Sequence, residues 1–582
     1  MSVIDNKKIS HDSKDINDAI DSNNTSNIPA NSNKSKLLKR IYDNLQIRKI
    51  NEFEFLIENA DIDIARNKEM MGGDYGRKQQ RQKQFRMRVP VRILANDLLV
   101  SHMLSDRTVG QAMNVSTLPG IIKHVVVLPD GHEGYGFPVG CVAATNLEEE
   151  GEFERRDKIG GVISPGGVGY DINCGVRLIR TNLVENDVKF KLRELVNELF
   201  DSIPSGLGSK GRIELTKLEL DKVLVEGAGW AISQGYGWHG MDTDVCEENG
   251  CIENADPTNQ IVSDIAKRRG ISQIGSLGSG NHFLEVQKVD KILNEAAARI
   301  MGITQIGQIT ILIHCGSRGF GHQLCSDYLR ISEIAMREYN IQLPDRELAC
   351  VPHSSEVGQN YVKAMNCALN FAWCNRHMIM HWTRKTFEKV FHKGDQDLDM
   401  RLVYDVAHNI AKVEYHDIDR LESNNSIGLG KIVNNKRNRN NMGHKKVLVH
   451  RKGATRAFPA GMNQIPLIYR NIGQPVIIPG SMGTASWLLL GGPNSMNLTF
   501  GSAAHGAGRM MSRSAARRSH TQLQVSKLLE SRGIYVKSLT REGIVEESPD
   551  AYKDVDIVAD VSHNLGIATK VARLVPLCVI KG

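Results

Sequence analysis

Short runs of apolar residues alternate along this chain with turns rich in glycine, serine, aspartate and histidine. The runs have the length and composition of buried β-strands, and longer stretches with apolar residues every three or four positions predict helices. Each predicted strand leads directly into a polar, glycine-rich turn. Strands are predicted at 124–129, 175–180, 309–314, 447–450 and 475–480, and helices at 188–202, at 359–391 and after His505.

The order of these elements favours one fold class. Strands outnumber clear strand–helix–strand units, which favours a mixed α+β fold over a doubly wound parallel sheet. Residues 38–582 are therefore predicted to form one large catalytic domain whose active site lies in glycine-rich loops at strand ends.

Two polar segments are predicted to lie outside that domain. Residues 1–37 are rich in Asn, Ser, Asp and Lys, which is typical of a disordered extension. Residues near 421–445 are rich in Asn and predict a disordered insertion. The Lys and Arg residues of this insertion leave an RNA-binding arm as the alternative.

Composition narrows the class of protein. A net charge of +7 fits a polyanionic substrate but is weaker than that of a purely electrostatic nucleic-acid binder. The ten cysteines lack compact disulfide spacing, and the first residues lack the pattern of a secretory signal. We therefore expect reduced thiols and a cytoplasmic or nuclear location.

Several loops, most of them glycine-rich, carry side chains of the types that bind metals or catalyse reactions. Each of these residues alone has an ordinary interpretation, because a histidine at a strand end is usually a satisfied polar group and a cysteine is often simply buried. The loops are 128–140 with His132, 164–177 with Asp171 and Cys174, 275–287 with His282, 312–322 with His314, 405–414 with His408, 479–487, and 502–513 with His505.

The coincidence of these loops indicates a metal site. Imidazoles, a thiolate and a carboxylate together suit a divalent ion such as Mn²⁺, and a bridging thiolate could hold two ions near one phosphoryl group. Glycine-rich turns expose backbone N–H groups that cradle phosphates. The sequence therefore predicts a phosphoryl- or nucleotidyl-transfer site.

His505 differs from the other histidines. It is predicted to open a helix, and small residues and Arg509 follow it. An imidazole nitrogen can attack a nucleotide phosphorus and form a phosphoramidate. A helix cap and a further metal ligand remain the alternatives for His505.

The loop motifs resemble those of one family. PDGHEGYGFPVG, PGGVGYDINCGVRL, GSGNHFLEVQ, IHCGSRGFGH, DVAHNIAKVE, HRKGATRAFP, QPVIIPGSMGTASWLL, SAAHGAGRMMSR and the terminal VIKG are similar, in order, to motifs of the RtcB family of RNA-splicing ligases. The resemblance runs from about residue 50 to Gly582, apart from the Asn-rich insertion. It implies a ligase that uses GTP and two Mn²⁺ ions to join a 2′,3′-cyclic phosphate or 3′-phosphate RNA end to a 5′-hydroxyl end.

The resemblance also implies roles for single residues. Cys174 would bridge the two ions, with Asp171, His282, His314 and His408 as the other ligands, and His505 would carry GMP. The GTP contacts it implies are Asn281, His282, Phe283, Leu284, Glu285, His408, Asn409, Pro479, Gly480, Ser481, Met482, Ser486, His505, Gly506, Ala507, Gly508 and Lys581.

The implied reaction has three stages. The cyclic phosphate opens to a 3′-phosphate, His505 takes GMP from GTP and passes it to that phosphate, and the 5′-hydroxyl then expels GMP. Because a protonated imidazole cannot attack, guanylylation is expected to fall at acidic pH.

Other functions and partners stay open at this point. The alternatives are a Mn²⁺-dependent phosphodiesterase or cyclic phosphatase that joins no ends, and a non-catalytic RNA-binding subunit. The expected partners are tRNA halves, with archease and a helicase-containing ligase complex as further candidates.

His377 and His381 are interpreted as structural or surface residues, and His132 and His322 as active-site support. The basic residues Arg77, Lys78, Arg81, Lys83, Arg86 and Arg88 form a solvated face or RNA phosphate contacts.

Overall fold

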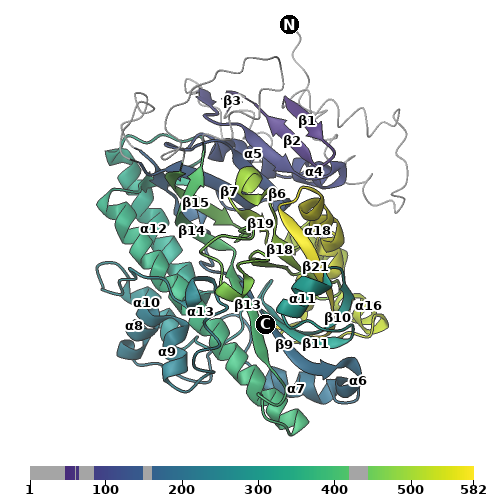
Figure 1. Cartoon of the computed structure of the whole chain (residues 1–582). Coiled ribbons are helices and arrows are strands. Elements are labelled where there is room, and N and C mark those ends of the chain that lie inside the picture. Colours follow the sequence, from purple (N-terminus) through teal and green to yellow (C-terminus); the bar gives the residue numbers. More distant parts are fainter. Residues whose placement is uncertain (1–45, 59–60, 64–83, 149–159, 419–443) are drawn as a thin grey trace.

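Two large β-sheets and a set of surrounding helices make up the described part of the protein (Figure 1). The computed structural model describes residues 46–58, 61–63, 84–148, 160–418 and 444–582. The predicted disordered extension, nearly all of the Asn-rich insertion, and Arg77, Lys78, Arg81 and Lys83 lie outside these residues.

The larger sheet has eight strands and is mainly antiparallel. Its order is β13-β9-β11-β10-β21-β18-β17, and β20 pairs with β21 in the only parallel pairing recorded for this sheet among the described residues. The strands are β9 (Gly175–Val184), β10 (Phe283–Ile292), β11 (Gln308–Cys315), β13 (Arg401–Ala407), β17 (Pro475–Ile478), β18 (Ser486–Gly491), β20 (Tyr535–Ser538) and β21 (Ala568–Lys581).

The second sheet has seven strands in the order β1-β2-β5-β6-β7-β15-β14. Its strands are β1 (Ile47–Asn51), β2 (Glu54–Ile57), β5 (Val91–Leu94), β6 (Val125–His132), β7 (Val139–Asn146), β14 (Asn409–Asp417) and β15 (His444–Lys452). Two-stranded pairs are formed by β3 (Asp61–Asp63) with β4 (Gln84–Arg86), β8 (Val162–Ile163) with β12 (Val351–Pro352), and β16 (Ala454–Arg456) with β19 (Ser502–Ala504).

The chain passes directly from the larger sheet to the second one at His408. β13 ends at Ala407 and β14 begins at Asn409, so His408 is the single residue between them. This residue therefore stands where the two sheets meet.

The helices pack around the sheets, and α12 lies beside α13 (Figure 1). The middle of α13 is buried on all sides, as expected for a helix that crosses a protein interior. None of the helices in the described ranges combines the length and apolar character needed to cross a membrane. The helices are α4 (Asp97–Leu104), α5 (Thr108–Val115), α6 (Glu185–Val188), α7 (Leu192–Ser202), α8 (Lys217–Glu226), α9 (Ala228–Ser233), α10 (Asp264–Ile271), α11 (Glu295–Ile300), α12 (Arg318–Glu338), α13 (Glu356–Phe391), α14 (Ser495–Thr499), α15 (Arg513–Ser519), α16 (Gln522–Ser531), α17 (Arg541–Glu546) and α18 (Val555–Asn564).

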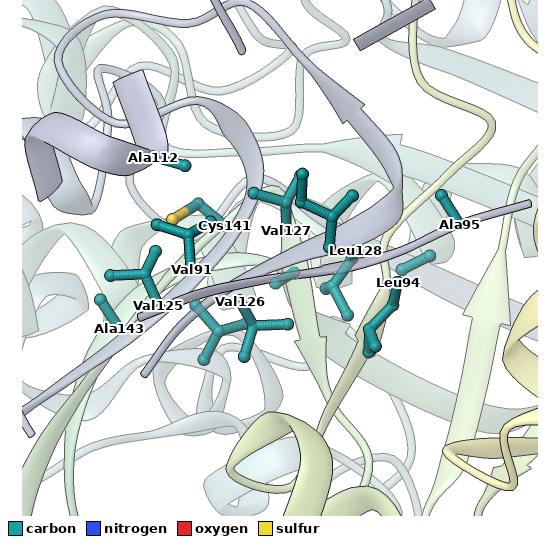
Figure 2. Close-up of a cluster of buried hydrophobic side chains, with 14 of the residues drawn as sticks. Val91, Leu94, Ala95, Ala112, Val125, Val126, Val127, Leu128, Cys141 and Ala143 are labelled. Atoms are coloured by element: carbon teal, nitrogen blue, oxygen red, sulfur yellow. The ribbon is translucent and has the colours of Figure 1, made fainter. Parts of the chain in front are cut away.

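Continuous apolar segments form the core of the second sheet. In Figure 2, Val125, Val126, Val127 and Leu128 of β6 lie among other buried side chains. All four are fully buried, so this strand has no solvent-facing side along its first half. That burial explains the unbroken apolar run in the sequence.

The mixed α+β fold is confirmed, and so is a strand at each of the five predicted positions. The long helix is confirmed with an earlier start, at Glu356, because the Ser355 side chain caps it by accepting from the Gly358 N–H. The predicted helix start at His505 is wrong. His505 follows strand β19, and the next helix begins at Arg513.

The cause of this difference is local. Gly508 has a φ of +74°, a left-handed conformation that interrupts a helix. The cap of α15 is instead Ser512, whose side chain accepts from the Ala515 N–H. The glycines after His505 build a loop and not the first turn of a helix.

Candidate active site

A cavity of about 280 Å³ gathers most of the residues singled out in the sequence. Its walls come from segments that are hundreds of residues apart in the chain. The predicted site residues that line it are Asp171, Cys174, Asn281, Phe283, His314, His408, Asn409, Pro479, Gly480, Ser481, Met482, His505, Gly506, Ala507, Gly508 and Lys581.

The register of the larger sheet brings the metal-binding types of side chain together. β11 pairs with both β9 and β10, and His314 lies opposite Val176 on one side and Phe283 on the other. Cys174 and His282 immediately precede these two strands. Because neighbouring strands are antiparallel, two strand starts and one strand end meet at the same edge of the sheet.

The donor atoms converge closely. Cys174 Sγ lies 3.3 Å from Nε2 of both His282 and His314. His314 Nε2 is 3.2 Å from His408 Nε2, and His282 Nε2 is 2.8 Å from Asp171 Oδ2. The donors form two triplets, Cys174 with His314 and His408, and Cys174 with Asp171 and His282, so that the thiol belongs to both.

The electrostatics of this cluster favour a bound cation. Burial lowers the pKa of His314 and His408 well below the ordinary value, so both imidazoles are neutral and keep a lone pair for coordination. Burial opposes a charge on His282, but the neighbouring Cys315, Cys174 and Asp171 raise its pKa well above the ordinary value. The surroundings of His282 therefore stabilise positive charge.

Without a cation, the Cys174 thiol would keep its proton. Burial, reinforced by the Asp171 carboxylate, raises the pKa of Cys174 to about 12. A coordinated divalent ion deprotonates a thiol outright. Imidazole, thiolate and carboxylate donors at these separations fit two divalent ions that share the Cys174 sulfur.

His505 is held on the opposite wall by Asp130. The buried Asp130 carboxylate accepts from the His505 backbone N–H at 2.9 Å and from His505 Nδ1 at 2.5 Å. A neutral imidazole that donates from Nδ1 keeps its lone pair on Nε2. The His505 ring centroid is 4.8 Å from that of His408, so this nitrogen is next to the metal-type cluster.

Sequence reasoning missed Asp130. The residue lies inside the quoted 128–140 loop, but only His132 of that loop was singled out. The signal was present, since Asp130 comes at the end of a buried apolar strand, where side chains meet the active-site edge.

Two glycine-rich loops are tied together beside His505. The Ala507 N–H donates to the Pro479 carbonyl at 3.0 Å. A Cβ on Gly508 would lie 2.1 Å from the Asp130 carbonyl oxygen. Only glycine allows this approach, which keeps the 505–508 loop on the Asp130 strand.

Lys581 is not a frayed chain end. It belongs to β21, lies opposite Phe283 of β10, and is 3% exposed. Its Nζ donates to the Gly280 carbonyl at 2.6 Å. Burial lowers the pKa of Lys581, and the Glu547 carboxylate, 3.8 Å away, counteracts that effect.

Glu547 is a second residue that the sequence did not reveal. Its buried carboxylate accepts from Arg509 and Arg513, each at 3.3 Å, and from the Tyr552 hydroxyl. All four of these residues line the cavity. No local motif surrounds Glu547, so the sequence carried no signal for it.

Four predicted site residues lie behind the cavity wall. The His282 ring does not line the cavity, but its Nε2 is close to Cys174 and Asp171 of the cluster. The Leu284 side chain packs into a hydrophobic cluster on the other face of β10. Glu285 and Ser486 are linked through the Gln287 amide, which donates to both.

The remaining histidines have other surroundings. His132 lines the cavity and its Nδ1 is 3.1 Å from the Asp130 carbonyl, whereas His322 stacks on Tyr170. His377 is buried, with its Nε2 2.5 Å from the Tyr236 carbonyl and its Nδ1 3.2 Å from Arg177 Nη1. His381 makes edge contacts with aromatic rings. His377 is thus a structural residue, as predicted.

Comparisons with known proteins agree on one family. Residues 111–582 match the family model described as tRNA-splicing ligase RtcB. The chain is 54% identical to the tRNA-splicing ligase RtcB of Thermococcus kodakarensis over 85% of this chain and 95% of the relative. It is 52% identical to the protein of the same name from Aeropyrum pernix, over 85% of this chain and 96% of the relative.

Proposed function

Because this chain belongs to the RtcB family of tRNA-splicing ligases, we propose that it is an RNA ligase that uses GTP and Mn²⁺ to join RNA ends. The ends are a 2′,3′-cyclic phosphate or 3′-phosphate and a 5′-hydroxyl, and tRNA halves are the proposed substrates. Archease and a helicase-containing complex stay predictions from the resemblance.

One observation carries this proposal. His505, held at Nδ1 by Asp130, lies beside a cluster of five metal-binding types of side chain, four of which line the same cavity. A phosphodiesterase or phosphatase would use the metal-type cluster with water as its nucleophile, whereas guanylyl transfer also needs a nucleophilic nitrogen beside the ions, which His505 supplies. The His505–Asp130 pair therefore favours the ligase.

Asp171, Cys174, His282, His314 and His408 would hold the ions. When bound, Mn²⁺ would supply Lewis-acid stabilisation of negative charge on phosphate oxygens. The protein's own contribution is to fix the donors before the substrate arrives, which lowers the cost of reorganisation during the reaction.

The first chemical step on the chain itself is guanylylation of His505. Nε2 attacks the α-phosphorus of GTP, a P–N bond forms, and the bond from the α-phosphorus to the bridging oxygen breaks to release pyrophosphate. The Asp130 carboxylate keeps the Nδ1 proton in place and stabilises the positive charge that develops on the ring.

GMP then passes from His505 to the RNA 3′-phosphate. The P–N bond breaks as a phosphate oxygen of the RNA attacks, and the activated RNA end carries a pyrophosphate bridge to guanosine. The 5′-hydroxyl of the second RNA attacks the RNA phosphorus and GMP leaves. Arg509 and Arg513, which line the cavity, would neutralise phosphate charge during these steps.

The nucleotide would lie along the glycine-rich wall. Loops 479–482 and 506–508 line the cavity, and their glycine and small residues leave room for phosphate groups there. Guanine offers an O6 acceptor and an N2 amino donor. The Lys581 ammonium of β21, which lines the cavity, would donate to O6, and the Glu285 carboxyl, behind the wall on the adjacent strand β10, is the proposed acceptor for the amino group.

The deciding experiment is to incubate the purified chain with GTP labelled at the α-phosphate and Mn²⁺. We expect a covalent GMP adduct that forms on the wild type, is absent from His505→Ala and is retained by His563→Ala, an exposed histidine of α18. Addition of RNA ends should consume the adduct and yield joined RNA. A wild type that cleaves cyclic phosphate but forms no adduct would establish the phosphodiesterase alternative.

A further inference from the structure

A buried arginine on α13 makes hydrogen bonds to three of the segments that carry the metal-type side chains. Arg376 has no exposed surface, and all five of its N–H donors are used. A buried charge must be paired and hydrogen-bonded to be tolerated, and the identity of the partners indicates what this arginine does.

Two of the partner segments contain proposed ligands directly. Nη1 donates to the Asn173 carbonyl at 2.8 Å and to the Cys315 carbonyl at 2.9 Å. Asn173 lies between Asp171 and Cys174, and Cys315 follows His314. One nitrogen thus joins the loop of two ligands to the strand of a third.

The third segment is reached through a carboxylate. Arg376 Nε and Nη2 form a two-pronged pair with the buried Asp405, at 3.0 and 2.7 Å. Asp405 lies in β13, which ends directly before His408. The same Nη2 donates to the Asn173 side-chain oxygen at 2.9 Å.

The backbone around Arg376 is shaped to admit it. A Cβ on Gly175 would lie 3.0 Å from Arg376 Nη1, so the glycine after Cys174 makes room for the guanidinium. Asn173 has a φ of +52°, a left-handed conformation that turns its carbonyl toward the arginine. The neighbouring residue Asn375 extends the arrangement, since its Oδ1 accepts from the Ser276 N–H of the segment that leads to His282.

We infer that Arg376 is a positioning residue for the metal site: it fixes the mutual placement of the segments that hold Asp171, Cys174, His314 and His408. The inference rests on the metal part of the proposed function. It predicts that substitution of Arg376 alters the affinity and geometry of metal binding in a protein that still folds.

Arg384 provides a matched control on the same helix. It is also buried, forms a two-pronged pair with Asp242 at 2.6 and 2.8 Å, and donates to the Met400 carbonyl. Met400 precedes β13 at the end remote from His408, so Arg384 contacts no loop that carries a proposed ligand. Replacing either arginine with lysine keeps the charge but removes the planar guanidinium that pairs with a buried aspartate through two hydrogen bonds.

The test is Mn²⁺ titration of the full chain by calorimetry, without GTP or RNA, together with electron paramagnetic resonance of the bound Mn²⁺. For Arg376→Lys we expect metal binding about 10- to 100-fold weaker, the usual effect of removing a group that orients ligands, and loss of the spin-coupled signal of two bridged ions. Arg384→Lys should match the wild type in both readouts. Thermal unfolding of the metal-free proteins should be lowered similarly by both substitutions.

A milder variant covers the case in which Arg376→Lys does not fold. Asn173→Gly keeps the left-handed backbone but removes the side-chain oxygen that Arg376 holds, and it should weaken Mn²⁺ binding by about 10-fold at most. The inference would be overturned if the folded Arg376→Lys variant kept the wild-type Mn²⁺ affinity and signal. If only Asn173→Gly folds, the same result for that variant would overturn it. A wild type that binds no Mn²⁺ would also overturn it. A wild type that binds Mn²⁺ but forms no GMP adduct would refute the ligase proposal alone.

Discussion

The two walls of the cavity are built in different ways. The metal-type cluster comes from one edge of the larger sheet, where strand register and Arg376 fix its members. His505 comes from the two-stranded pair β16/β19, and a carboxylate of the second sheet, Asp130 of β6, holds it. His408, between β13 and β14, is where the walls meet.

The difference teaches that binding metal and activating the nucleophile depend on separate frameworks. A defect in the cluster should abolish both metal binding and guanylylation, because the proposed reaction uses the ions. A defect on the His505 wall should impair guanylylation and leave metal binding intact. Each prediction below tests this asymmetry.

Replacing the shared thiol should have the largest effect. Cys174→Ser removes the one donor common to both triplets, and a hydroxyl is a poor substitute for a thiolate at a Mn²⁺ site of this kind. We expect loss of tight Mn²⁺ binding by calorimetry and adduct formation at least about 10³-fold slower, as several kcal/mol of charge stabilisation disappear. Cys578→Ser, at a buried cysteine outside the cluster, is the control and should bind Mn²⁺ normally.

Asp130→Asn should separate the two walls most clearly. The amide no longer fixes the proton on Nδ1 of His505, so the attacking nitrogen is often protonated. Adduct formation should slow by about 10²- to 10⁴-fold, as when a carboxylate that orients a catalytic histidine becomes an amide. Mn²⁺ affinity should be unchanged, and a parallel fall in affinity would show that the walls are one framework.

Lys581→Met should affect nucleotide choice more than chemistry. The substitution removes the proposed donor to guanine O6 but keeps the length of the side chain. We expect the KM for GTP to rise about 10- to 100-fold, the cost of one hydrogen bond to a charged group, and discrimination against ATP to narrow. Adduct formation measured over a range of GTP and ATP concentrations tests this, and an unchanged preference for GTP would remove Lys581 from base recognition.

The sequence predicted the cluster better than the His505 wall, for a physical reason. The five donors Asp171, Cys174, His282, His314 and His408 each lie next to a glycine-rich turn or a strand end, and in a mainly antiparallel sheet such ends meet. Local pattern was therefore enough to group them. The grouping was correct, although no pattern gave the pairing order β13-β9-β11-β10 on which it depends.

The missed residues act over long distances in the chain. Asp130 and His505 are 375 residues apart, and Arg376 and Asn173 are 203 apart. No periodicity links such partners. The wrong helix start at His505 arose because the alanines around it favour a helix by composition, whereas the left-handed Gly508 and the Ser512 cap decide where α15 begins.

The smallest predicted effect concerns Glu285, a buried residue of β10 in the larger sheet whose carboxyl accepts from the Gln287 amide. Burial raises the pKa of Glu285 to about 8, and the Gln287 amide and the Lys581 ammonium offset only part of that rise. In the unfolded chain the carboxyl has its ordinary value of 4.5. Between these two values the folded protein therefore holds a proton that the unfolded chain has released.

The sign of the pH effect follows from this difference. Because the folded state binds more protons, the free energy of unfolding falls as pH rises from about 4.5 to 8. The glutamine of Glu285→Gln cannot ionise, so this variant does not lose stability over that pH range. Its Tm, relative to the wild type, should rise by roughly 1–3 °C between pH 5.5 and 7.5, a modest shift because the chain is large. The comparison is made without metal or GTP, since ligands would add their own stabilisation. Parallel Tm curves would mean that Glu285 is already ionised in the folded protein, and base recognition would then begin from a carboxylate.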